Sequence, residues 1–283
     1  EIDFIKGDWR TGVDPNIVEQ KLKEDTDKKI KAVCAVHNET STGVTSRIGE
    51  IRKAMDSANH PALLFVDTIS SLGSIDYKHE EWKVDVTVGG SQKGLLLPPG
   101  LSFNAISSKA LEAYKKSDLP KSYWDWEPMI ESNKKGHFPY TPATNLLYGL
   151  DEAINMLMEE GLENVFSRHK RFAEATRIAV NAWGLEVLCK NPEEYSNTLT
   201  AVLVPEGHDA DALRKIILDD YNMSLGAGLA KVAGKIFRIG HLGDLNSTMI
   251  LGAISTAELA MYDVGIKFEL GSGVAAAIRH LKV

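Results

Sequence analysis

The feature that most constrains the fold is the alternation of short apolar runs with segments of helical period. The apolar runs occupy residues 31–37, 62–67 and 84–90, and the helical segments occupy residues 44–58 and 108–116. This alternation predicts a mostly parallel sheet, because helical crossovers join parallel strands. The runs are continuously apolar, which indicates helices on both faces of the sheet. We therefore expect the carboxyl ends of the strands to face a ligand crevice.

The second half of the chain predicts a smaller α+β unit. A stripe of leucines after Asn145 predicts a helix that ends at Gly161, and a second helix runs to Trp183. Two strands and two helices are expected next, at residues 197–204, 211–221, 235–240 and 247–262. We expect two domains: a large domain at residues 1–160, incomplete at its N-terminus, and a small C-terminal domain at residues 161–283.

Residues 121–144 break this rhythm. Tyr123, Trp124 and Trp126 are crowded there with three prolines, and no helical or strand period is visible. We interpret the segment as a long ordered loop. Long loops inside compact proteins are usually functional, and the aromatic residues favour a subunit contact. A loop that only packs locally is the alternative.

Composition limits the partners of the chain. The net charge of −7 gives no basic surface for phosphates, so we expect small molecules or other proteins and no nucleic acid. No apolar run approaches the ~20 residues that span a bilayer, so no membrane partner is expected. The two cysteines, Cys34 and Cys189, support neither a disulfide framework nor a cysteine-rich metal site, which fits a reducing, cytoplasmic setting.

Lys93 is the first candidate for chemistry. It lies between an apolar strand and a run of three leucines and two prolines. Burial there disfavours the ammonium form and favours the neutral amine, which is the form that attacks an aldehyde in Schiff-base chemistry. A surface lysine at the end of a strand is the alternative interpretation.

Asp67 and Arg238 are candidates for the same crevice. Asp67 ends a predicted parallel strand, where its carboxylate could pair with a pyridinium nitrogen or simply cap the next turn. Arg238 lies in a predicted strand between apolar neighbours and therefore needs a partner. A substrate carboxylate and an internal salt bridge are the two alternatives.

The segment HNETSTG at residues 37–43 has the composition of a turn that donates hydrogen bonds to an anionic or ring-bearing ligand. Thr40, Ser41 and Thr42 are the available donors. A helix N-cap formed by Thr45 or by the next serine is an alternative that could coexist with this role.

Several known motifs are missing from the sequence. GGSQKG does not match a P-loop, and no G-x-G-x-x-G follows a strand, so nucleotide binding is disfavoured. The histidines show no metal-ligand spacing, and we expect no metal site; His79, His169 and His208 are interpreted as solvated or structural residues.

Five segments, in this order along the chain, resemble the class V aminotransferases of fold type I: HNETSTGV, LLFVDTISSLGS, GGSQKGLLLPPG, PYTPATNLLYGL and KIFRIGHLG. The resemblance runs from near Glu1 to the end of the chain. It is nearest to the family members that use serine and glyoxylate. It implies an α/β fold with a mostly parallel large domain and a smaller α+β domain, and pyridoxal 5'-phosphate as the cofactor.

The resemblance also implies a role for individual residues. Lys93 would bind the cofactor covalently and later move a proton on the substrate carbon, and Asp67 would pair with the pyridine nitrogen. Thr40 and Gln92 would contact the cofactor. Arg238 would bind the substrate carboxylate.

The same resemblance implies a homodimer. Thr141 matches a position that reaches across the dimer interface to the cofactor phosphate of the other subunit, and Tyr140 is a second candidate for this contact. The aromatic segment at residues 121–144 would then be an interface element.

The implied reaction is transamination in two halves. A small amino acid, with serine favoured, gives up its amino group and leaves as an oxo acid; glyoxylate then takes the amino group. Serine would give hydroxypyruvate, and glyoxylate would give glycine. Alanine and aminoethylphosphonate are alternative donors, because the residues that choose among small side chains cannot be separated by sequence reading.

One departure from the family is expected to matter. The chain begins with Glu1 rather than Met, and nothing before HNETSTG matches the family's N-terminal arm, its phosphate-binding glycine turn or its ring-stacking aromatic residue. A cysteine desulfurase or selenocysteine lyase is less favoured, because neither cysteine lies on a suitable mobile loop. A non-catalytic scaffold is the remaining alternative.

Overall fold

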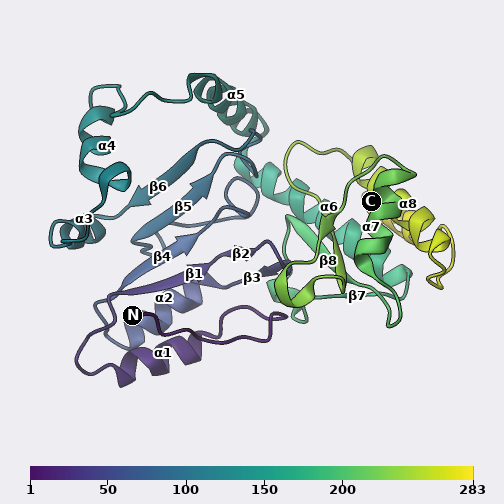
Figure 1. The fold of residues 1–283 in the computed structure, drawn as a ribbon, viewed down its shortest axis with the longest axis horizontal. Helices are drawn as coiled ribbons and strands as arrows, with labels where there is room; N and C mark the ends of the chain where they lie inside the picture. Colours follow the sequence, from purple (N-terminus) through teal and green to yellow (C-terminus); the bar gives the residue numbers. More distant parts are fainter. Residues whose placement is uncertain (283) are drawn as a thin grey trace.

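The computed structural model describes residues 1–282 and confirms a mostly parallel sheet in the first half of the chain (Figure 1). Its strand order is β1-β4-β5-β6. Strands β1 (Ala32–Val36), β4 (Leu63–Asp67) and β5 (Val86–Gly90) run parallel to one another. Strand β6 (Ser102–Ile106), which sequence analysis did not predict, runs antiparallel to β5.

Two helices bury one face of this sheet. Helix α1 (Pro15–Glu24) begins at the Asp14 cap, whose side chain accepts a hydrogen bond from the Asn16 amide, and helix α2 spans Ile48–Ser57. Apolar residues of both helices form one buried cluster with β1 and β4: Val18, Leu22, Ile48, Ile51, Met55, Ala35, Leu64 and Val66. This packing positions the strands rigidly beneath the loops that follow them.

Within residues 1–282, helices pack against one of the two faces on which they were expected. The buried cluster against this sheet draws its helical residues from α1 and α2, and Cys34 and Val36 on β1 are exposed. Burial along β4 alternates, with Leu64 and Val66 buried and their neighbours partly exposed.

Helix α2 begins later than predicted. Residues 44–45 form strand β3 (Val44–Thr45), which pairs with β2 (Asn38–Glu39) in a small hairpin. The predicted N-caps are wrong, because the cap residue is Arg47 and no side chain caps the helix. The hydroxyl of Thr45 donates to Asn38 Oδ1 instead, and Ser46 Oγ accepts from the Val13 amide.

Residues 121–144 are not structureless. A 3₁₀ turn at Ser122–Trp124 is followed by helix α4 (Trp126–Asn133). The Asp125 carboxylate caps α4 by accepting from the Glu127 amide. Pro128 lies in the first turn of the helix, where no intrahelical amide bond is needed, so the proline does not break it. The prediction of a continuous loop was wrong for this physical reason.

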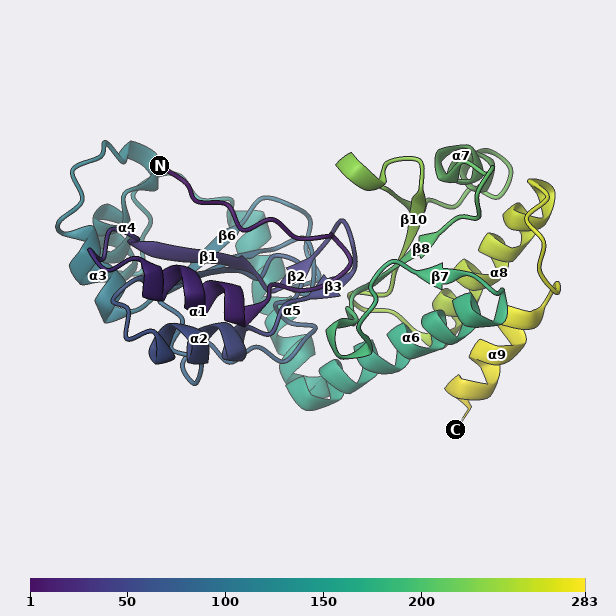
Figure 2. The ribbon, with the colours of Figure 1, turned by 90° about the horizontal axis from the view of Figure 1, so that it is seen from below.

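Two long helices connect the two halves of the molecule. Helix α5 (Thr144–Glu160) ends at Gly161 with φ 83°, as predicted, and helix α6 (Leu162–Ala182) carries the chain from the first sheet to the second (Figures 1 and 2). Trp183 caps α6, in agreement with the predicted end. The boundary predicted between residues 160 and 161 lies at this junction, and the division into two domains stays a prediction.

The second sheet is antiparallel and has the order β7-β8-β10-β9. Its strands are β7 (Glu186–Val187), β8 (Leu199–Leu203), β9 (Gly226–Ala227) and β10 (Ile236–Gly240). Strands β8 and β10 confirm the two predicted strands. The remaining helices of the described chain are α3 (Ser108–Tyr114), α7 (Ala210–Asp219), α8 (Ser247–Asp263), α9 (Ser272–Leu281) and the 3₁₀ turns Pro192–Glu194 and Ala230–Val232.

The N-terminal segment joins the two sheets. It runs extended beside β1 toward the second sheet before α1 begins (Figure 2). Arg10 Nε donates to the Leu188 carbonyl at 2.7 Å, and the Gly12 amide donates to Glu194 Oε2 at 2.8 Å. Within residues 1–282, no helix combines the length and the apolar character needed to cross a membrane.

Candidate functional site

The parallel strands bring three loops to one edge of the sheet. Val36 on β1 pairs with Asp67 on β4, and Asp67 pairs in turn with Val88 on β5. The segments that follow these strands therefore emerge side by side. This is the edge at which sequence analysis expected a ligand crevice.

Asp67 closes the middle strand with an exposed side chain. Its Oδ1 atom accepts a hydrogen bond from the Ile69 amide at 2.8 Å, so the carboxylate does cap the next turn. No other hydrogen bond or ion pair of this carboxylate is found in the described part of the chain. The capping role and a role toward a ligand are therefore compatible.

Lys93 lies in a tight turn after β5. The turn is closed by hydrogen bonds from the Leu96 amide to the Lys93 carbonyl at 3.0 Å and from the Leu97 amide to the Ser91 carbonyl at 3.1 Å. The Lys93 side chain is half-buried, in agreement with the expectation that it is not fully solvated. Its amine forms no ion pair or hydrogen bond with any of residues 1–282, which leaves it available for a ligand.

A close backbone approach fixes this turn. A Cβ atom on Gly94 would lie 2.1 Å from the Leu72 carbonyl oxygen and 2.5 Å from Ser74 Oγ. Leu72 and Ser74 belong to the loop that follows Asp67. The loop after β4 and the turn that carries Lys93 are thus packed together without room for a side chain, and this contact brings Lys93 to the same edge as Asp67.

Thr40 lies at the tip of the β2–β3 hairpin and points to the same loop. Its hydroxyl is hydrogen-bonded to the Ser70 hydroxyl, three residues after Asp67. The other two predicted donors are less available: Ser41 donates to Glu39 Oε1 at 2.7 Å, and Thr42 is 3% exposed. Of the three hydroxyls, Thr40 is the half-buried one.

Arg238 reaches this hairpin from the second sheet. Its Nε atom donates to the Ala227 carbonyl at 2.7 Å, and its NH1 atom donates to the Thr40 carbonyl at 2.5 Å. Both partners are neutral carbonyls, and no carboxylate lies within salt-bridge distance in the described part of the chain, so the internal salt bridge considered above is not formed. Burial, followed by the nearby charge of Arg214, lowers the pKa of Arg238. The guanidinium remains a cation that can still attract an anion.

A buried histidine supports the central strand. His37 follows β1; its amide donates to the Asp67 carbonyl at 2.9 Å, and its Nδ1 atom lies 2.9 Å from Ser71 Oγ. Its ring meets Trp82 edge to face at a centroid distance of 5.9 Å. Burial lowers the pKa of His37 to about 4, so the ring is neutral at pH 7.

Gln92 and the two predicted interface residues, Thr141 and Tyr140, are exposed, whereas Lys93, Thr40 and Arg238 are half-buried. Gln92 is exposed beside Lys93, and its Oε1 atom would be 2.9 Å from a Cβ on Gly90. Thr141 and Tyr140 are exposed between α4 and α5, and the Tyr140 ring packs 5.1 Å from the Tyr123 ring. No hydrogen bond among residues 1–282 joins Thr141 or Tyr140 to the groups at the strand edge.

Three further residues, which were not predicted from the sequence, orient this site. Ser70 supports Thr40, Ser71 supports His37, and Gly94 lets the Lys93 turn approach the neighbouring loop. The signals were present in the hydroxyl-rich run TISS directly after Asp67 and in the glycine directly after Lys93. Both are short-range patterns whose meaning depends on which strands are neighbours.

The chemistry of the assembled groups is complementary to one kind of ligand. An unpaired amine can condense with an aldehyde, a carboxylate can hold a protonated ring nitrogen, and a guanidinium can hold a substrate carboxylate. The hydroxyl of Thr40 and the amide of Gln92 offer hydrogen bonds beside them. These residues fit pyridoxal phosphate together with an amino acid substrate.

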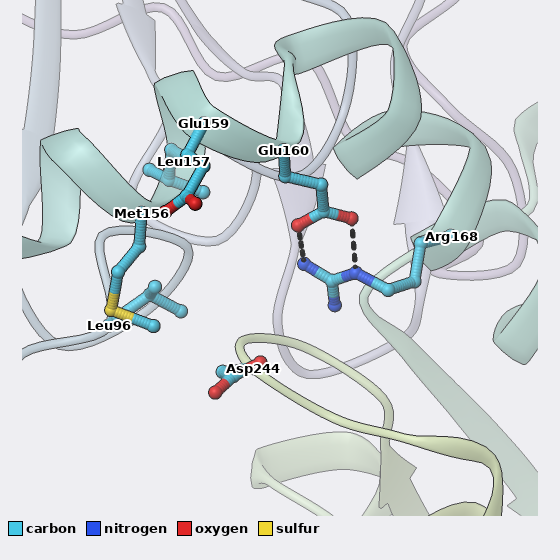
Figure 3. Close-up of a pocket in the computed structure, with 7 residues that line it drawn as sticks. All are labelled: Leu96, Met156, Leu157, Glu159, Glu160, Arg168 and Asp244. Carbon is cyan, nitrogen blue, oxygen red and sulfur yellow. Dashed lines mark hydrogen bonds and ion pairs between the residues drawn. The ribbon is translucent and has the colours of Figure 1, made fainter.

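A separate pocket of about 290 Å³ lies next to the Lys93 turn (Figure 3). Its lining residues are Leu96, Met156, Leu157, Glu159, Glu160, Arg168 and Asp244. None of the predicted site residues lines it. Leu96 is the link between this pocket and the turn that carries Lys93.

Comparison with known proteins gives a family for this fold and site. The model of the family Aminotransferase class-V matches residues 1–242. The chain is 54% identical over 280 residues to a serine–glyoxylate aminotransferase of Methylorubrum extorquens. This match covers 97% of this chain and 70% of that protein. It is 47% identical over 282 residues to an L-aspartate–glyoxylate aminotransferase of Paracoccus denitrificans, with 100% and 71% covered.

A solved structure agrees with these relatives. The ureidoglycine–glyoxylate aminotransferase of Bacillus subtilis superimposes with a TM-score of 0.89 at 27% sequence identity. The superposition covers 99% of this chain and 72% of that one. The similarity therefore extends over both sheets and the helices between them.

We predict that Gly94→Ala displaces the turn that carries Lys93. The added Cβ would meet the Leu72 carbonyl at 2.1 Å, so the backbone has to shift. We expect the free energy of unfolding to fall by about 1–3 kcal/mol, measured by urea denaturation. Gly252→Ala, in open space on α8, is the matched control and should be neutral or slightly stabilising. Equal urea midpoints for Gly94→Ala and wild type would contradict this packing.

We also predict an acid-sensitive step in stability from His37. The unfolded chain binds a proton on this ring below about pH 6.5, whereas the folded chain does not until about pH 4. Its contribution to the free energy of unfolding is thus fully present above about pH 6.5 and is lost as the pH falls from there toward 4.

The measurement is urea unfolding of wild type and His37→Asn between about pH 7 and pH 5. In the variant, the free energy of unfolding should fall less steeply with falling pH, by the part that comes from about one proton bound at His37 in the unfolded chain. The part of the pH dependence that comes from His241 should remain, because burial lowers the pKa of His241 to about 3 in both proteins. An identical pH dependence in the two proteins would show that His37 is not buried in its neutral form.

Proposed function

The chain belongs to the class V aminotransferases, a family that uses pyridoxal phosphate, and we propose that it transfers the amino group of serine to glyoxylate. The products are hydroxypyruvate and glycine. The observation that carries this proposal is the Arg238 guanidinium, which is held beside Thr40 by two neutral carbonyls and keeps its charge for a substrate carboxylate. The relative at 54% identity supports serine as the donor.

Four residues are proposed to hold the cofactor. Lys93 supplies the amine for its aldehyde, and the Asp67 carboxylate pairs with its ring nitrogen. The Thr40 hydroxyl and the Gln92 amide donate hydrogen bonds to it. When bound, pyridoxal phosphate supplies an electron-accepting ring that stabilises the charge left when the substrate carbon loses a proton.

Lys93 is proposed to move that proton. Its amine has no partner among residues 1–282, so no ion pair has to break before it acts as a base. General acid–base groups placed in this way contribute about 10²–10⁴-fold to a rate. In the second half of the reaction, the same amine gives a proton to the carbon of glyoxylate as it becomes glycine, because this half reverses the first.

Arg238 is proposed to orient the substrate. The planar guanidinium binds a carboxylate through two parallel hydrogen bonds, which fixes the substrate carbon relative to the base. Its Nε and NH1 atoms already donate to Ala227 and Thr40, which limits the rotation of the side chain. Both serine and glyoxylate carry the carboxylate that this residue would recognise.

Other amino donors are the nearest alternatives. The L-aspartate–glyoxylate aminotransferase at 47% identity favours aspartate as a second candidate, and alanine and aminoethylphosphonate are further possibilities. A cysteine desulfurase is disfavoured, because Cys189 is buried and its Sγ atom donates to the Asn191 carbonyl. Cys34 lies on strand β1 rather than on a loop.

The proposed reaction is tested by supplying the protein with pyridoxal phosphate, glyoxylate and one amino donor at a time. Serine should give hydroxypyruvate and glycine in equal amounts and with the highest kcat/KM. Lys93→Ala should lower kcat by about 10²–10⁴-fold, because the base is lost. A higher kcat/KM for aspartate or alanine would replace the proposed donor, and no amino transfer with any donor would refute the function.

Arg238→Gln is predicted to weaken binding of the substrate carboxylate. Loss of a charged hydrogen bond costs about 1.5–3 kcal/mol, so KM for serine should rise roughly 10- to 100-fold. Arg279→Gln on α9 removes an exposed charge far from this strand edge and serves as the control. An unchanged KM in Arg238→Gln would mean that another group binds the carboxylate.

We further propose a homodimer formed through the segment between α3 and α5. Tyr123 is 57% exposed and Trp124 is 82% exposed, and large exposed aromatic residues are enriched at subunit contacts. In this dimer, Thr141 and Tyr140 would contact the cofactor phosphate of the other subunit.

Sedimentation is the test of this dimer. The wild type should have twice the mass of 31.1 kDa, and Trp124→Ser should raise the dimer dissociation constant at least about tenfold. Leu218→Ser, on the exposed face of α7, is the control. A monomeric wild type, or a Trp124→Ser protein that dimerises as well as wild type, would refute this interface.

A cytoplasmic location is also proposed. It is supported by the two cysteines, which form no disulfide with each other. Cell fractionation tests it, and recovery of the protein in an oxidising compartment would contradict it.

A further inference from the structure

Two hydrogen bonds hold the loop after strand β10, at residues 241–246, by the backbone amide and the backbone carbonyl of Gly243. The Gly243 amide donates to His169 Nε2 at 3.1 Å, and the Gly243 carbonyl accepts from Arg168 NH1 at 2.7 Å. His169 Nδ1 lies 2.7 Å from the Val165 carbonyl, so Nδ1 carries the proton and Nε2 is the acceptor. We call Arg168, His169 and Gly243 the Gly243 clamp.

The clamp is itself anchored to the end of helix α5. Arg168 Nε donates to Glu160 Oε1 at 2.6 Å and NH2 donates to Glu160 Oε2 at 2.8 Å, which gives the parallel pair of bonds seen in Figure 3. Bidentate pairs of this kind hold both side chains in one orientation. Because Glu160 is the last residue of α5, the guanidinium joins α5, α6 and the loop after β10.

The clamp presents Gly243 to the turn that carries Lys93. A Cβ atom added to Gly243 would lie 3.5 Å from Leu96 Cδ2, so the Gly243 backbone faces the Leu96 side chain with room for about one methyl group between them. Leu96 closes the turn through the bond from its amide to the Lys93 carbonyl, and its φ of 61° is one that a leucine seldom adopts. Such a conformation persists only where surrounding contacts hold it. Leu96 lines one pocket together with Met156 and Leu157 of α5 and with Arg168 of the clamp.

We propose that Arg168 and His169 are positioning residues, which set the Lys93 turn relative to the strand that carries Arg238 by holding Gly243 beside Leu96. This inference rests on the proposed functions of Lys93 and Arg238. The base and the residue that holds the substrate come from different sheets, so their separation depends on contacts between the two halves. The clamp is one such contact: Gly243 lies five residues after Arg238, and Leu96, which Gly243 faces, lies three residues after Lys93.

The experiment compares Arg168→Met with Arg171→Met, which removes an exposed arginine one turn further along α6. Misplacing a reacting group by about 1 Å costs roughly 100-fold in rate, so kcat of Arg168→Met should fall about 10- to 100-fold. KM for serine should stay within about twofold, because the Thr40 and Ala227 carbonyls still hold Arg238. Arg168→Lys, which keeps one donor for the Gly243 carbonyl, should recover part of kcat.

A second readout does not depend on turnover. The rate at which pyridoxal phosphate becomes attached to Lys93, trapped by borohydride, should fall about tenfold in Arg168→Met and stay unchanged in Arg171→Met. Leu96→Ala removes the same contact from the other side and should give the same two effects. It decides the question if Arg168→Met does not fold.

The two levels of failure are distinguishable. If wild type neither attaches the cofactor at Lys93 nor transfers amino groups, the proposed function is wrong and the clamp loses its role with it. If wild type does both, but Leu96→Ala and folded Arg168→Met match the Arg171→Met control in kcat and attachment rate, the clamp inference alone is overturned. A rise in KM without a fall in kcat would also overturn it.

Discussion

The parallel pairing of β1, β4 and β5 is the constraint on which the rest of the structure depends. It aligns Val36, Asp67 and Val88 across three strands, so the segments that follow them leave the sheet at one edge. The buried cluster under β1 and β4 makes this register costly to change, because a shift of one residue would turn Leu64 and Val66 to solvent. The position of Lys93 follows from this register and from the close packing at Gly94.

The second sheet supplies the cation Arg238 to a site whose other residues follow the strands of the first sheet. Arg238 crosses to the Thr40 carbonyl, and the Thr40 hydroxyl is bonded to Ser70 in the loop after Asp67. This short chain of hydrogen bonds couples the two halves through polar groups, and Val44 of the β2–β3 hairpin adds an apolar contact by packing in the buried cluster of the second half. The coupling explains how a cation can stay half-buried without a carboxylate beside it, since carbonyl dipoles partly replace its water.

The sequence was sufficient for the features that depend on local pattern. The three parallel strands, the helix end at Gly161 and the strand around Arg238 were predicted, as was the common edge for Lys93 and Asp67. Helix α4 was missed for a local reason: the segment shows no helical period, and its Pro128 is tolerated in a first turn. The partners of Arg238 were missed because they depend on tertiary contacts. The carbonyl partners of Arg238 come from residues 11 and 198 positions away along the chain, beyond the reach of any spacing rule.

The central claim is that Lys93 is the residue that binds the cofactor. The most direct measurement is borohydride reduction of the protein with pyridoxal phosphate, followed by proteolysis and mass spectrometry of the labelled peptides. We expect one phosphopyridoxyl group per chain, on Lys93. Label on a different lysine, or no label at all, would contradict it.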